Sequence, residues 1–119
     1  MNTLSIDVRE SATDANLVLF KLTGHLDAQT VRELESRFEQ QVKAARVRWI
    51  VDLAELEYIS SAGLGSFVGV LSELRSQAGD IFFIGLSPKM EKIFKVLGFT
   101  RIFKVFATEA EASKAFKGA

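Results

Sequence analysis

The sequence predicts an α/β domain, with a mixed β-sheet of about four to five strands and about four α-helices packed on it. Short apolar runs alternate along the chain with segments in which apolar residues recur at helical spacing. The 119 residues are 48% hydrophobic and 25% charged, an ordinary composition for a domain with a substantial core. No repeat or linker-like tract divides the chain, so residues 1–119 are expected to form a single domain.

The expected strands differ in how far they are buried. Residues 4–8 alternate apolar with polar side chains, which predicts a strand with one covered face. Residues 17–22 are nearly all apolar, which is typical of a strand covered on both faces. The other expected strands are residues 49–51 and 81–84, with residues 102–105 as a fifth.

Capping signals mark the ends of the expected helices. Asp27 is placed to accept hydrogen bonds from the first-turn amides of a helix whose apolar stripe runs from Val31 to Val42. A second helix is expected from an apolar stripe between Leu64 and Gln77. A third should start at Ser87-Pro88 and end at Gly98, with an apolar face that includes Leu97. The capping-box spacing of Thr108 and Glu111 predicts a fourth.

Composition excludes several functional classes. Cysteine is absent and His25 is the single histidine, which excludes the usual zinc, iron–sulfur and thiol-nucleophile sites. His25 is expected to be a loop residue without a catalytic role. Fifteen basic and fifteen acidic residues give a net charge of zero, so nothing favours nucleic acid. The chain shows no signal sequence and no apolar window long enough for a membrane span, so a cytoplasmic location is expected.

Neither a metal nor a cofactor is expected. A polar link through Glu55 and Glu57 should follow the third strand, and with Asp52 it lacks the calcium-loop pattern, which favours a solvated acidic turn. The segment Gly63-Leu64-Gly65 lacks the lysine of a phosphate-binding loop and the spacing of a dinucleotide fingerprint. The sequence therefore predicts a binding protein rather than an enzyme.

The glycines of the second expected helix depart from what folding alone would favour. Gly63, Gly65 and Gly69 fall in its first turns, where each glycine costs about 1 kcal/mol relative to alanine. Gly65 and Gly69 are four residues apart, so they share a helix face that lacks side chains. Close packing on the domain's own sheet and a surface for a partner are both consistent with this pair.

Two serines stand at the start of the same helix. Either Ser60 or Ser61 could cap the free amides, and no acidic or glutamine residue three positions later distinguishes them. The functional alternative is that one serine accepts a phosphoryl group. A phosphate adds about −1.5 to −2 charges, and a helix N-terminus favours an anion, so the fold could tolerate that modification.

The sequence resembles a known family over nearly its whole length. The resemblance rests on Gly24-His25-Leu26-Asp27, on Asp52-Leu53, on residues 58–65 with the sequence YISSAGLG, and on the Ser87-Pro88 helix with its Leu97-Gly98-Phe99 end. These segments look like those of the STAS domains of bacterial anti-sigma factor antagonists. In the family motif the phosphoacceptor stands two positions before the Gly-Leu-Gly, which is Ser61 here. Ser60 occupies a position often held by aspartate, and Ala62 one often held by a second serine.

The resemblance implies a partner-switching regulator. The unphosphorylated antagonist would bind an anti-sigma factor that is also a serine kinase, and so release the sigma factor. Phosphorylation at Ser61, or alternatively Ser60, would end binding, and a PP2C-type phosphatase would restore it. The surface for this partner is expected to comprise Asp27, Ser60, Ser61, Ala62, Gly63, Leu64, Gly65 and Gly69.

A second interpretation stays open at this point. The chain could be a constitutive adaptor subunit of a larger sensory or transport complex, with Ser61 only capping its helix. The oligomeric state is also open, although we expect a monomer. An exposed apolar patch is expected within residues 98–106 only if the last helix leaves them uncovered.

Overall fold

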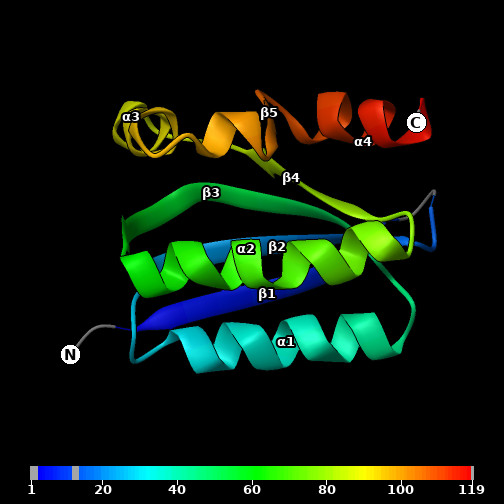
Figure 1. The fold of residues 1–119 in the computed structure, drawn as a ribbon, viewed down its shortest axis with the longest axis horizontal. Coiled ribbons are helices and arrows are strands. Elements are labelled where there is room, and N and C mark those ends of the chain that lie inside the picture. Colours follow the sequence, from blue (N-terminus) through cyan, green and yellow to red (C-terminus); the bar gives the residue numbers. More distant parts are fainter. Residues whose placement is uncertain (1–2, 12–13, 119) are drawn as a thin grey trace.

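The computed structural model describes residues 3–11 and 14–118, which form one five-stranded mixed sheet and four α-helices (Figure 1). The α/β prediction is confirmed. In chain order the elements are β1 (Leu4–Glu10), β2 (Leu17–Leu26), α1 (Val31–Lys43), β3 (Arg48–Ile59), α2 (Ser61–Ser76), β4 (Asp80–Ile84), α3 (Pro88–Val96), the 3₁₀ helix η1 (Phe99–Arg101), β5 (Lys104–Phe106) and α4 (Glu109–Lys117).

The strands follow one another across the sheet in the order β1-β2-β3-β4-β5. β1 is antiparallel to β2, whereas β2, β3, β4 and β5 are parallel to their neighbours. Parallel neighbours need a crossover between them, and α1, α2 and α3 supply it. The carboxyl ends of β2, β3 and β4 therefore share one edge of the sheet, and the segments leading to these helices start there.

Both faces of the sheet are covered, as the apolar run at residues 17–22 predicts. Val18 and Phe20 point into the larger core, which α1, α2 and α3 close. Leu17 and Leu19 point to the other face, where α4 packs on them. The Phe116 ring of α4 stacks on Phe82 with centroids 3.8 Å apart. Phenylalanine side chains thus contribute to the packing on both faces of the sheet.

The third strand is longer than predicted. It continues through Glu55 and Glu57 to Ile59, so the expected acidic turn is wrong: these carboxylates lie on exposed positions of β3. The pairing of β3 with β2 contains two register shifts. Buried side chains then recur every third residue at Leu53, Leu56 and Ile59, and this spacing hides the strand from a search for strict alternation.

The predicted caps of the later helices are confirmed. Ser87 accepts a hydrogen bond from the Met90 amide at the start of α3, and Gly98 adopts a left-handed conformation with φ 74° after its end. Thr108 accepts a hydrogen bond from the Glu111 amide at the start of α4. The fifth strand is confirmed, but it is displaced to Lys104–Phe106 because η1 precedes it.

Candidate functional site

Asp27 and Ser60 follow two neighbouring parallel strands at the carboxyl edge of the sheet. The last residues of these strands, Leu26 and Ile59, are paired in the β2–β3 register. The Ser60 amide donates a hydrogen bond to the Leu26 carbonyl oxygen over 2.9 Å. The segment that carries Asp27 and the start of α2 therefore lie next to each other.

Ser60 is the N-cap of α2. Its backbone is extended, with φ −93° and ψ 173°, and its hydroxyl oxygen accepts a hydrogen bond from the Gly63 amide over 3.2 Å. The Ser60 carbonyl accepts the first regular helical bond, from Leu64. The side chain satisfies one of the amides that every helix start leaves without a partner. Capping therefore accounts for the serine at this position.

Ser61 is the first residue of α2 and is exposed. Within the described residues its side chain has no hydrogen-bond partner, so capping does not account for it. The first turn of α2 carries no acidic side chain. No negatively charged side chain in this turn therefore compensates the positive end of the helix dipole. Of the two serines, Ser61 has the accessible hydroxyl.

The three glycines of α2 have different surroundings. A Cβ atom on Gly63 would lie 2.7 Å from Cγ of Leu26, so this glycine allows α2 to pack closely on the end of β2. A Cβ atom on Gly65 or Gly69 would meet nothing within 4 Å. Packing inside the domain therefore explains Gly63 and does not explain the other two.

The outward face of α2 carries no charge over most of its length. Its first charged residue is Glu73, in the second half of the helix. Uncharged surface of this kind costs little to remove from water. The exposed residues before that point are Ser61, Ala62, Gly65, Val68, Gly69 and Ser72.

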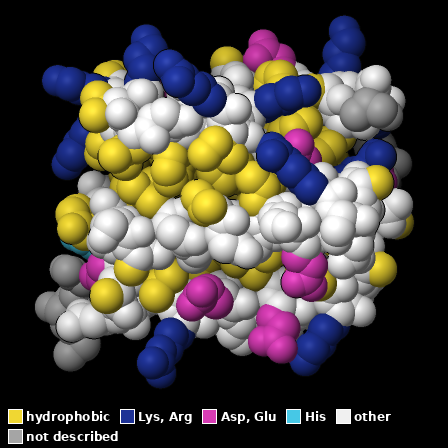
Figure 2. Space-filling view, viewed as in Figure 1, with side chains coloured by type: hydrophobic (Ala, Val, Ile, Leu, Met, Phe, Trp, Pro, Cys, Tyr) yellow, Lys and Arg dark blue, Asp and Glu magenta, His cyan; other side chains and the backbone are white. Residues whose placement is uncertain are grey.

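Exposed hydrophobic side chains lie on α2, at the end of α3 and just after η1. Val96 and Leu97, at the end of α3, are 75% and 53% exposed, and Val68 of α2 is 42% exposed. Ile102, which follows η1, is 39% exposed. Figure 2 shows hydrophobic side chains gathered between α2 and the α3–η1 segment. Such a patch on a domain of this size is typical of an interaction surface.

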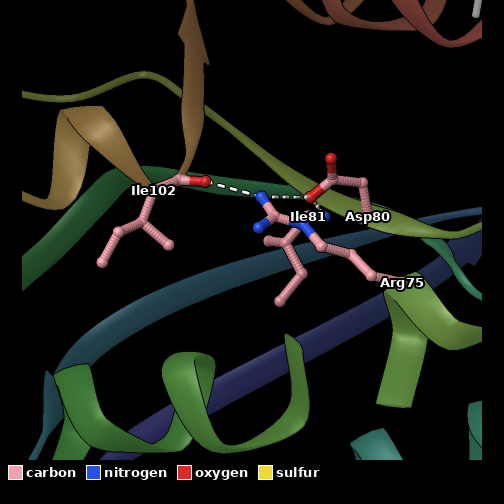
Figure 3. Close-up of polar contacts among 4 residues, drawn as sticks. All are labelled: Arg75, Asp80, Ile81 and Ile102. Atoms are coloured by element: carbon pink, nitrogen blue, oxygen red, sulfur yellow. Dashed lines mark hydrogen bonds and ion pairs between the residues drawn. The ribbon is translucent and has the colours of Figure 1, made fainter. Parts of the chain in front are cut away.

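Arg75 fixes one border of this patch. Its Nη2 atom donates a hydrogen bond to the Ile102 carbonyl oxygen over 2.6 Å and lies 3.4 Å from Oδ1 of Asp80 (Figure 3). The same Asp80 oxygen accepts a hydrogen bond from the Ile81 amide over 2.8 Å. The end of α2, the start of β4 and the segment after η1 are thereby held together, which sets where Ile102 lies relative to α2.

Asp27 does not occupy the N-cap position of α1 as predicted. Thr30 does, and it makes no capping bond there with its side chain. The Asp27 carboxylate instead accepts hydrogen bonds from the amides of Gln29 and Thr30, over 2.9 and 3.1 Å, in the turn before the helix. The predicted capping chemistry is present one turn earlier, because the chain turns before it becomes helical.

These features match a known family over almost the whole chain. The family model for the STAS domain matches residues 6–112. The chain belongs to the STAS domain family. An anti-sigma-B factor antagonist of Listeria monocytogenes is 34% identical to this STAS domain over 109 residues, which are 91% of this chain and 93% of that one.

Two solved structures of SpoIIAA, a protein named as an anti-sigma factor antagonist, have the same fold. The unphosphorylated form is 24% identical, with a TM-score of 0.81, and covers 97% of this chain and 98% of its own. The phosphorylated form, from Bacillus, is 25% identical, with a TM-score of 0.71, and covers 93% of this chain and 98% of its own.

The predicted site residues of this STAS domain fall into three groups by burial and hydrogen bonding. Asp27 and Ser60 are half-buried and engaged in hydrogen bonds at the helix starts. Gly63 and Leu64 are buried, so they position α2 and offer no side chain to a partner. The exposed residues of the predicted set are Ser61, Ala62, Gly65 and Gly69.

Two exposed hydrophobic residues at the end of α3 were not predicted. The expected place of Leu97 on the apolar face of the third helix is wrong: α3 ends at Val96, and Leu97 is its exposed C-cap residue. Val96 was not singled out, although it lies off the apolar stripe of its helix. An apolar residue at such an off-stripe position is the signal that would have indicated an exposed hydrophobic contact.

The structure also describes the surroundings of the single histidine and of the carboxylates. His25 Nε2 lies 3.5 Å from Oε2 of Glu57, and its ring is near Tyr58, on paired positions of β2 and β3, so His25 is a strand residue rather than a loop residue. Within residues 3–11 and 14–118, no group of three or more His, Cys, Asp or Glu side chains is suited to a metal ion. In those same ranges no helix has both the length and the apolar character needed to cross a bilayer.

Proposed function

We propose that this STAS domain is an anti-sigma factor antagonist that binds an anti-sigma factor through the start of α2. The observation that carries the proposal is the exposed hydroxyl of Ser61, next to a neighbouring serine that already caps the helix. The relative from Listeria monocytogenes is an anti-sigma-B factor antagonist, which supports the choice of partner. The chain acts by binding and carries out no reaction of its own.

The binding surface comprises the uncharged face of α2 and the hydrophobic side chains beside it. Gly65 removes a side chain from the middle of this face, so a partner backbone could approach the helix closely. Val68, Leu97 and Ile102 supply apolar area next to it. A buried contact of small and apolar groups tolerates no unpaired charge, because desolvating a charge is costly.

Phosphorylation of Ser61 is the proposed control. The phosphoryl group would come from a partner with serine kinase activity, and a PP2C-type phosphatase would remove it. The dianion would lie at the positive end of α2, where the fold tolerates it, and inside an uncharged interface, which does not. A penalty of about 3 kcal/mol would weaken binding more than 100-fold. SpoIIAA exists in unphosphorylated and phosphorylated forms, which supports this control.

Affinity capture from the native cell tests both parts of the proposal. The baits are the wild-type chain, Ser61→Asp, and Ser60→Asp as the matched control for an added charge one residue away. We expect an anti-sigma factor with a kinase domain to be captured by the wild type and lost with Ser61→Asp. Mass spectrometry of the wild-type chain should find phosphate on Ser61 and none on Ser60.

Three other outcomes of the affinity capture would contradict parts of the proposal. Equal capture by the wild type and Ser61→Asp, with Ser61 never modified, would contradict the switch and favour the constitutive adaptor. Phosphate on Ser60 with Ser61 unmodified would contradict the assignment of the acceptor. Loss of capture with Ser60→Asp alone would show that the cap, and not the exposed serine, controls binding.

A further inference from the structure

A groove lies between α1 and α2, on the side of α2 that faces away from α3. We propose that this groove binds an amphipathic helix of a partner protein, which is apolar on one face and basic along its edges. The groove shares Gly69 with the uncharged face of α2 but is otherwise lined by different residues, and this proposal does not depend on the Ser61 contact.

The groove has an apolar floor. Its volume is about 530 Å³, and Phe38 and Val42 of α1 and Val70 of α2 line it. Phe38 belongs to the main core, and the two valines are only partly buried against it. Apolar area therefore stays exposed along the line where the two helices meet. A helix that inserts apolar side chains at helical spacing would remove this area from water.

Gly69 widens the α2 wall of the groove. It is among the lining residues, and a Cβ atom at this position would meet nothing within 4 Å. No contact within the domain therefore requires glycine here, although glycine in a helix is less stable than alanine. The open position leaves room for the backbone or a bulky side chain of an occupant.

The charges around the groove favour a basic occupant. Glu35, Glu39 and Glu73 line it, together with one basic residue, Lys43. The Lys43 ammonium lies 3.2 Å from a carboxylate oxygen of Glu39, so its charge is already balanced within α1. The other two carboxylates remain for a partner. Figure 2 shows that most of the acidic side chains on this face lie over the α1–α2 half, whereas most of the Lys and Arg side chains lie over the α3–α4 half.

The shape favours a helix over a small molecule. The groove lining runs from residue 35 to residue 43 of α1, which is about 12 Å at the usual helical rise. About two turns of a partner helix would match this length, with lysine or arginine at the edges facing Glu35 and Glu73. An acidic helix or a nucleic acid would be repelled by the same rim.

Peptide titration followed by NMR tests this proposal. The probe is a 15-residue amphipathic peptide with leucine on one face and lysine at the edges, and its control has glutamate in place of lysine. We expect the lysine peptide to shift amide resonances around Val42, Gly69 and Val70, and to bind at least tenfold more tightly than the control. Perturbations that map elsewhere, or equal binding of the two peptides, would overturn the proposal.

Matched variants separate this groove from the Ser61 surface. Gly69→Leu should weaken peptide binding at least tenfold, whereas Gly65→Leu, on the same helix but outside the groove lining, should leave it unchanged. Ser61→Asp should also leave it unchanged while abolishing capture of the anti-sigma factor, so either proposal can fail alone. If the groove resonances shift with protein concentration without peptide, the occupant is a second copy of this chain and the proposal is wrong.

Discussion

Ser60 and Ser61, at the start of α2, differ in their hydrogen bonding and exposure. Ser60 accepts a hydrogen bond from the Gly63 amide and stabilises the helix, whereas the Ser61 hydroxyl is exposed. The sequence could identify the pair but could not assign the roles, because both positions satisfy the preference for serine at a helix start. The choice depends on where β3 ends, and the register shifts between β2 and β3 determine that position.

This division predicts different stabilities for two alanine variants. Ser60→Ala should lower the free energy of unfolding by about 1 kcal/mol, because it removes the cap. Ser61→Ala should change it by less than about 0.5 kcal/mol, since the lost side chain is exposed and bonds to none of the residues that the structure describes. Urea denaturation of both variants measures the difference. Equal losses would contradict the assigned cap.

At the scale of elements, the glycines of α2 make this helix less stable than alanine at the same positions would. The position of the helix was predictable from its apolar stripe, and so was the presence of glycines in its first turns. Which glycine faces the sheet was not predictable, because that depends on the rotation of α2 above β2. The end of β3 escaped prediction for a related reason: its buried side chains recur every third residue.

Alanine at two of these glycines should have opposite effects. Gly63→Ala should destabilise the domain by about 1 kcal/mol or more, because the new methyl would lie 2.7 Å from Cγ of Leu26 in the core. Gly65→Ala should stabilise it by up to about 1 kcal/mol, since its methyl meets nothing within 4 Å. Thermal and urea denaturation would measure both changes. Destabilisation by Gly65→Ala would show that the open position serves the fold itself.

On the scale of the whole molecule, hydrophobic side chains serve two purposes. Phe116 stacks on Phe82 and closes the smaller core beneath α4, with 3% of its surface exposed. Val96 has 75% of its surface exposed and contributes to no core. Composition predicted the presence of a core, whereas only the position of Val96 off the apolar stripe of its helix indicated that this side chain lies outside it.

Truncating each of these side chains should separate stability from binding. Phe116→Ala should cost about 3 kcal/mol of unfolding free energy, because it leaves a cavity against Phe82. Val96→Ala should change stability by less than about 0.5 kcal/mol and yet weaken binding of the anti-sigma factor. Denaturation and calorimetric titration measure the two quantities. Unchanged affinity in Val96→Ala would exclude the end of α3 from the interface.

The strand order also bears on how the chain acquires its structure. Every strand pairs with the strand that precedes it in the sequence, so no pairing has to wait for a later segment to insert between two earlier ones. The sheet can therefore grow in one direction while the ribosome is still delivering the chain. The β2–β3 pair that places Ser61 precedes α3 and α4 in the sequence, so this pairing needs no strand or helix from the later part of the chain.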